Sequence, residues 1–258
     1  MMQRELEMLQ DTVRRAGQRV LQLAQDGFDT HIKQDRSPVT SADLEVGRLL
    51  RQDLLGAFPD DGWLSEEDPD DPQRLDKKRI WVVDPIDGTK YFMKGVPQYT
   101  ISVALVKASR PVTAVVYNPA TKQLFSAVRS SGAWLNGHRI RVRNPHTRPS
   151  ILVSPPAWER GRFRTLEAAA ECRPIGSIAY TLALIAAGQA DGTLNMDRLN
   201  EWDVAAGVLL VEEAGGIALD SKGNQLRFNQ PQTAIQGIIA APIGLKDRME
   251  TFAKALWF

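Results

Sequence analysis

Apolar residues recur at intervals of three and four between residues 2 and 27, and the same spacing returns between residues 41 and 56. This periodicity predicts two helices, each with one apolar stripe facing a core. We expect Ser41 to cap the second helix, because its side chain can accept a backbone amide of the first turn. The segment between them, residues 33–40, is polar and basic. Pro38 forbids a helix there, so this segment is expected to form a loop or a hairpin.

The middle of the chain alternates short apolar runs with turn residues, which favours strands. Residues 80–83 form a continuous apolar run, as in a strand that is buried on both faces. We expect this strand to end at Asp84, because Pro85 cannot donate to a sheet ladder. The Asn136-Gly137 pair predicts a hairpin turn. The region suits a large antiparallel sheet, with further strands at residues 99–106, 112–117 and 124–128.

After about residue 147 the pattern changes to alternating strands and helices. Strands are expected at residues 150–153, 217–219 and 237–240, and helices at residues 163–170, just after Ser177, at 204–213 and at 247–256. No flexible linker separates the two patterns. We therefore expect an N-terminal α+β half, residues 1–147, and a C-terminal α/β half, residues 148–258, with helices packed on both sides of sheets.

Composition and charge limit the kinds of binding partner and the cellular compartment that we expect. The 32 basic and 31 acidic residues give a net charge of +1, which supplies no field for a nucleic-acid polymer or a membrane surface. The single cysteine, Cys172, cannot form an internal disulfide and has no neighbouring metal-ligating residues. The N-terminus is charged from the start, and no apolar run reaches the length of a signal peptide or a membrane span. We expect a cytoplasmic protein.

Candidate chemistry begins in residues 81–90, where a buried strand runs into an Asp-Gly turn. Asp84 and Asp87 lie three residues apart, so both carboxylates can point into one space. Two such anions repel unless a cation neutralises them. Ile86 excludes two related sites, because a calcium loop needs an oxygen ligand at that position and a haloacid-dehalogenase phosphatase needs its aspartate nucleophile there.

Two further acidic elements are less specific when each is considered alone. Residues 62–68 end in Ser-Glu-Glu-Asp and resemble an ordinary solvated loop. Residues 200–207 contain Trp202-Asp203, where Asp203 fits the N-cap of a helix. A Glu-Ala-Gly-Gly sequence follows at residues 213–216.

Together, in this order, the three elements resemble the motifs of the inositol monophosphatase family of magnesium-dependent phosphatases. The resemblance implies a layered αβαβα sandwich of the sugar-phosphatase type, with two sheets and helices between and outside them. It implies a site for two or three Mg²⁺ ions, inhibition by Li⁺, and a homodimer. The ligands that it implies are the carboxylates of Glu66, Asp84, Asp87 and Asp203 and the backbone carbonyl of Ile86; the last carboxylate comes from the C-terminal half.

The same resemblance assigns the catalytic and substrate contacts. Thr89 holds the attacking water and pairs with Asp43, and Glu66 shares in catalysis. The backbone amides of Gly88 and Thr89 are expected to donate to phosphate. The expected substrate contacts are Gly88, Thr89, Lys90, Ser177 and Asp203.

The branch of the family is set by the residues after the turn. Gly88-Thr89-Lys90-Tyr91-Phe92 is most similar to the 3'(2'),5'-bisphosphate nucleotidases, which implies hydrolysis of 3'-phosphoadenosine 5'-phosphate to AMP and phosphate. An inositol-1-monophosphatase or a fructose-1,6-bisphosphatase-like sugar phosphatase is the alternative, and a silent relative that only binds a metal or a small phosphate is another. Lys33 and Arg198 fit either extra cations near the substrate or solvated surface charges. The three histidines, His31, His138 and His146, fit surface positions.

Overall fold

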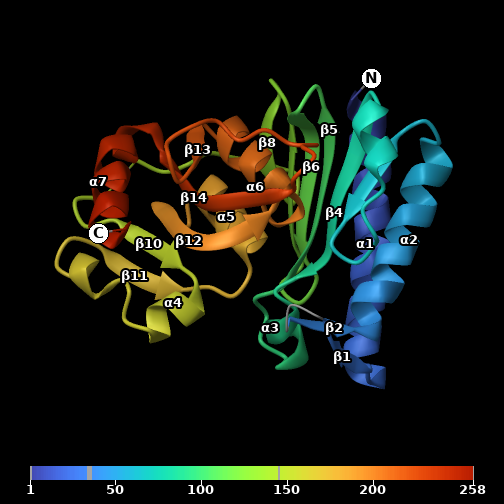
Figure 1. Ribbon diagram of the computed structural model, residues 1–258, viewed down its shortest axis with the longest axis horizontal. Coiled ribbons are helices and arrows are strands. Elements are labelled where there is room, and N and C mark those ends of the chain that lie inside the picture. Colours follow the sequence, from blue (N-terminus) through green and yellow to red (C-terminus); the bar gives the residue numbers. More distant parts are fainter. Residues whose placement is uncertain (1, 34–36, 145, 258) are drawn as a thin grey trace.

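The computed structural model describes residues 2–33, 37–144 and 146–257, and it has five layers (Figure 1). One layer is a seven-stranded sheet in the order β3-β4-β5-β6-β7-β8-β9, in which neighbouring strands are antiparallel except for the parallel pair β3 and β4. Its strands are β3 (Gly62–Ser65), β4 (Arg79–Asp87), β5 (Thr100–Lys107), β6 (Arg110–Asn118), β7 (Gln123–Val128), β8 (Gly132–Leu135) and β9 (His138–Ile140). The predicted strands and the hairpin at Asn136-Gly137 are confirmed.

Two helices, α1 (Met2–Asp26) and α2 (Ser41–Ala57), cover the outer face of this sheet (Figure 1). The apolar stripes predicted from the sequence are the buried faces of both helices. Ser41 is not the cap of α2. The N-cap is Thr40, whose side chain accepts the amide of Asp43 while the Asp43 carboxylate accepts the amide of Thr40. This reciprocal pair satisfies two amides of the first turn.

The segment between α1 and α2 pairs β1 (Thr30–Ile32) with β2 (Pro38–Thr40) in an antiparallel hairpin, as one of the two expected alternatives. Residues 34–36, the centre of the predicted loop, lie outside the described residues. The hairpin lies beside the short helix α3 (Thr89–Met93), at one end of the seven-stranded sheet (Figure 1).

The second sheet has five strands in the order β11-β10-β12-β14-β13. Helices α5 (Ile178–Ala186) and α6 (Glu201–Glu213) lie between the two sheets, and α7 (Lys246–Trp257) lies on the far side (Figure 1). The strands are β10 (Ser150–Val153), β11 (Glu171–Pro174), β12 (Gly192–Asn200), β13 (Gly216–Asp220) and β14 (Ala234–Pro242). A short helix, α4 (Pro155–Glu159), follows β10. The layered αβαβα sandwich is confirmed.

The largest core cluster surrounds α5 and α6 and takes side chains from both sheets, such as Val82 and Ile238. Since these helices are buried on nearly every side, they show no apolar stripe. Gly207 allows them to approach closely, because a Cβ at this position would lie 2.5 Å from the Leu182 side chain. None of the helices among the described residues is both long enough and apolar enough to span a bilayer.

Several predicted boundaries are wrong. Pro85 does not end the strand at Asp84: β4 continues to Asp87, and the register shifts where the proline lies. Such an irregularity tolerates the missing donor. The helix expected at residues 163–170 is only a 3₁₀ turn, Arg164–Leu166. Helix α6 begins at Glu201 with Asn200 as its N-cap, so Asp203 is the third helical residue and not the cap.

Candidate metal centre

Three acidic side chains from three distant segments meet at one end of the seven-stranded sheet. Glu66, Asp84 and Asp203 each offer a carboxylate oxygen, and these oxygens lie within 4.8 Å of one another. The parallel pairing of β3 with β4 brings the first two together, since the Glu66 amide donates to the Val83 carbonyl at 3.2 Å. Asp203 reaches the same point from the start of α6. We call these three residues the acidic trio.

Backbone amides fix two members of the acidic trio. The amide of Ile86 donates to Asp84 Oδ1 at 3.1 Å, and the amide of Asn200 donates to Asp203 Oδ2 at 2.6 Å. Asp84 is buried, with 1% of its surface exposed. Burial, followed by the charges of Glu66, Asp87 and Asp203, raises the pKa of Asp84. Burial and the Asp87 charge likewise raise the pKa of Asp203. The cluster favours a bound cation.

Lys33, from the β1–β2 hairpin, contacts the acidic trio. Its Nζ lies 2.8 Å from Glu66 Oε1 and 2.7 Å from Glu67 Oε1. Burial opposes its charge, but the two glutamates outweigh burial and raise the pKa of Lys33. Burial raises the pKa of Glu67 to about 7. Of the two cations considered from the sequence, Lys33 therefore reaches this centre, whereas Arg198 is exposed and lines neither of the cavities described below.

Asp87 is oriented differently from the trio. Its Oδ2 accepts the hydroxyl of Ser177 and the amide of Ala179, the latter at 2.6 Å, at the start of α5. Burial raises the pKa of Asp87 to about 7 against these hydrogen bonds. Ser177 is fully buried. Its hydroxyl holds Asp87 and it lines neither of the cavities described below, and its contact with substrate stays a prediction.

Thr89 and Asp43 form the pair expected from the sequence. The Thr89 hydroxyl lies 3.1 Å from Asp43 Oδ1 and 3.0 Å from the Ile86 carbonyl oxygen. Asp43 Oδ2 accepts both the amide and the hydroxyl of Thr40, at 2.7 and 2.5 Å. Burial raises the pKa of Asp43. The capping box of α2 therefore aims one carboxylate oxygen at Thr89.

A tight turn places Thr89 at this point. Gly88 has a φ of +91°, and a Cβ there would lie 2.7 Å from the Gln98 carbonyl oxygen, so only glycine fits.

Two adjoining cavities meet at the acidic centre. The smaller, of about 190 Å³, is lined by Glu66, Asp84, Ile86 and Thr89 among others. The larger, of about 270 Å³, extends toward the five-stranded sheet. Asp87, Lys90, Tyr91, Gly176 and Asp203 line both.

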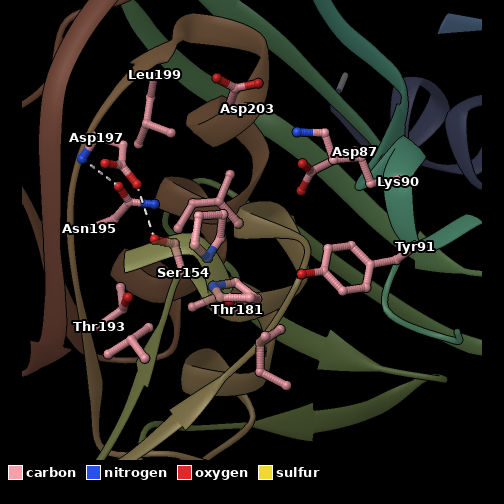
Figure 2. Close-up of a pocket in the computed structure, with 16 residues that line it drawn as sticks. Asp87, Lys90, Tyr91, Ser154, Thr181, Thr193, Asn195, Asp197, Leu199 and Asp203 are labelled. Carbon is pink, nitrogen blue, oxygen red and sulfur yellow. Dashed lines mark hydrogen bonds between the residues drawn. The ribbon is translucent and has the colours of Figure 1, made fainter. Parts of the chain in front are cut away.

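Figure 2 shows Lys90 and Tyr91 facing a polar wall across the larger cavity. In this wall the Ser154 hydroxyl donates to Asp197 Oδ2 at 3.0 Å, and the Asp197 amide donates to Asn195 Oδ1 at 2.9 Å. Ser154 follows the carboxyl end of β10, where ligands often bind in α/β folds. Nothing in the sequence singled out Ser154, although the strand before it was predicted.

Comparisons with known proteins identify the family of this chain. The model of the inositol monophosphatase family matches residues 1–258. An inositol-1-monophosphatase of Rhizobium meliloti is 40% identical over 195 residues, which cover 72% of this chain and 73% of the relative. A histidinol-phosphatase of Chlorobaculum parvum is 32% identical over 232 residues, covering 86% and 87%.

Among solved structures, the IMPase of Thermotoga maritima superposes with a TM-score of 0.87 at 26% identity, covering 99% of this chain and 98% of that one. Sequence and fold thus agree over the whole chain. The protein belongs to the inositol monophosphatase family and is a phosphoric monoester hydrolase.

Proposed function

We propose that this protein is a Mg²⁺-dependent phosphomonoesterase that works at the acidic trio on the phosphate ester of a small polar alcohol. The observation that carries the proposal is the convergence of Glu66, Asp84 and Asp203 within 4.8 Å. A set of oxygen ligands without histidine or cysteine suits Mg²⁺. When bound, Mg²⁺ supplies Lewis acidity and lowers the pKa of water. Two or three ions, with Asp87 and the Ile86 carbonyl as further ligands, are part of the proposal, as is inhibition by Li⁺.

Asp43 and Thr89 are proposed to orient the attacking water. Oδ1 of the ionised Asp43 accepts a hydrogen bond from the Thr89 hydroxyl, so the Thr89 oxygen can accept a hydrogen bond from the water. Glu66 faces the same cavity. The amides of Gly88 and Thr89 are proposed to donate to phosphate oxygens. The chain thereby holds the nucleophile and the phosphate in one geometry before reaction.

The polar wall of the larger cavity supports a hydroxyl-bearing leaving group. Asp197 and Asn195 supply oxygen acceptors, and the Ser154 hydroxyl already donates to Asp197. Arg160 and Arg162 lie 3.9 and 3.6 Å from Asp197 Oδ1 and offset its charge, so it is the oxygen acceptors that favour a polyol such as inositol. The names of the two relatives, an inositol-1-monophosphatase and a histidinol-phosphatase, support a small phosphorylated alcohol.

Lys90 favours a second candidate, the hydrolysis of 3'-phosphoadenosine 5'-phosphate to AMP and phosphate. Its side chain lines both cavities, so one cation could contact a second phosphate while the first lies at the acidic trio.

The cytoplasmic location, the homodimer and the division into halves at residues 147 and 148 also stay proposals.

A substrate panel tests the proposal. Purified protein with Mg²⁺ is incubated with inositol-1-phosphate, histidinol phosphate, fructose-1,6-bisphosphate and 3'-phosphoadenosine 5'-phosphate, and phosphate release is measured. We expect the highest kcat/KM with a polyol monophosphate. Preference for the nucleotide, lost selectively in Lys90→Met, would establish the second candidate. No release from any ester while Mg²⁺ still binds would identify a silent relative.

A further inference from the structure

The first turn of α6 is held by a buried glutamate that neither cavity contains. The Glu201 carboxylate accepts the amides of Asn229 and Gln230 at 2.6 and 2.8 Å. The Glu201 amide donates to the Thr233 carbonyl at 3.0 Å. Only 1% of Glu201 is exposed. The segment 229–233 is thus fastened to the helix that carries Asp203.

A buried arginine fastens the same segment to the other side of the site. Arg74 is 2% exposed and lies in the 3₁₀ helix Pro72–Asp76. Its guanidinium donates to the Asn229 side-chain oxygen at 2.7 Å and to the Gln230 carbonyl at 2.9 Å. It also donates twice to Asp70, at 2.6 and 2.9 Å. The Asn229 side chain donates back to the Arg74 carbonyl at 3.2 Å.

The two ends of this network are close along the chain to two members of the acidic trio. Arg74 follows Glu66 by eight residues, in the 3₁₀ helix that packs against β3, and Glu201 precedes Asp203 by two residues. Residues 229–230 hydrogen-bond to both Arg74 and Glu201. The network, which we call the Arg74–Glu201 clasp, therefore bears on the distance between Glu66 and Asp203, which come from different layers of the fold.

We propose that Arg74 and Glu201 are positioning residues that set the affinity of the acidic trio for Mg²⁺. Mg²⁺ requires near-ideal octahedral geometry, so a small displacement of Asp203 relative to Glu66 weakens binding. Hydrogen-bond partners behind the ligands of a metal typically change affinity 10–100-fold. The inference rests on the proposed function, because it presupposes that the trio binds Mg²⁺.

Isothermal titration with Mg²⁺ alone tests the inference. In Glu201→Gln, one of the two amides loses its acceptor, and we expect the Kd for Mg²⁺ to rise about tenfold. The same rise is expected in Arg74→Met, and Arg74→Lys should not rescue it because lysine lacks the planar fork. At saturating Mg²⁺, kcat should stay within about threefold of the parent, since the reacting groups are unchanged. Circular dichroism confirms folding of each variant.

Asp191→Asn is the matched control, because it breaks a buried carboxylate–arginine pair at the other end of β12. It should lower stability without changing the Kd for Mg²⁺. The inference is overturned if Glu201→Gln and Arg74→Met bind Mg²⁺ within twofold of the parent, or if the control weakens binding equally. A parent protein that binds no Mg²⁺ would overturn the proposed function as well, so the two failures are distinguishable.

Discussion

Carboxylates lie at the two ends of β12, Asp191 fully buried and Asp203 half-buried, and their charges are compensated differently. Asp191, just before the strand, is fully buried and accepts two hydrogen bonds from Arg143, both at 2.6 Å, and the Ser150 amide at 2.7 Å. Asp203, just after the strand, meets Glu66 and Asp84 instead. Among the described residues, neither Asp84 nor Asp203 forms an ion pair with lysine or arginine; Lys33 pairs with Glu66.

The pKa shifts of Asp191 and Asp84 have opposite directions because their neighbours differ in charge. Burial alone would raise the pKa of Asp191, but the hydrogen bonds from Arg143 and Ser150 outweigh it and lower the pKa. At Asp84, burial and the neighbouring carboxylates all act in the same direction and raise the pKa. The first carboxylate is neutralised within the chain and serves the fold. The acidic trio leaves negative charge for a cation from solution, at a cost to stability that is typical of functional sites.

The largest expected effect is that of Asp84→Asn on catalysis. Since the proposed function has this carboxylate hold Mg²⁺ at the phosphate, we expect kcat/KM to fall about 10³-fold, in the range of losses seen when one electrostatic group is removed. The melting temperature without metal should stay equal or rise, because one of several repelling charges is gone. A variant with unchanged phosphate release would contradict the assignment of the trio.

The opposite pattern is expected for Asp191→Asn. Removing one partner leaves the Arg143 guanidinium without its carboxylate, and we expect a loss of about 3 kcal/mol in the free energy of unfolding. Chemical denaturation measures this loss, and phosphate release below the transition should be unchanged. Equal losses of stability in Asp84→Asn and Asp191→Asn would remove the distinction between the two ends of β12.

Local sequence patterns were sufficient to predict the helices, strands and turns that depend on a few consecutive residues. The stripes of α1 and α2, the apolar run of β4 and the Asn136-Gly137 turn were predicted because each depends on a few consecutive residues. The members of the trio were named only through the resemblance of three acidic motifs, taken together, to those of a known family. β12 was missed because its register shifts between Asn195 and Arg198, which breaks the alternation of apolar and polar residues.

Contacts between distant segments could not be predicted in this way. The orientation of Asp87 depends on Ser177 and Ala179, about ninety residues away. Arg74 meets Asn229 and Gln230 from a polar stretch that carries no periodic signal. Such pairs become neighbours only once both sheets are assembled, so they depend on the layers of the fold and not on spacing along the chain.

Removing divalent metal should affect the two ends of β12 differently. We expect Mg²⁺ at about 100 times its Kd to stabilise the parent by about 2.7 kcal/mol, from mass action alone. Asp191→Asn should gain the same increment, whereas Asp203→Asn should gain much less. Thermal melts in EDTA and in Mg²⁺ measure the increments. An increment that survives in Asp203→Asn would place the bound metal elsewhere.

The smallest expected effect is the pH dependence contributed by Asp191. The pKa of Asp191 is lower in the folded state than in the unfolded state. At pH values between these two pKa values, the folded state therefore binds fewer protons than the unfolded state. This contribution to stability is present above the unfolded value of about 3.9, and it is lost as the pH falls through the folded pKa. Denaturation between pH 6 and pH 3, in EDTA, should therefore show a shallower acid loss in Asp191→Asn than in the parent. Parallel curves for the two proteins would mean that the Arg143 pair does not hold this carboxylate ionised, which would remove the contrast between the two ends of β12.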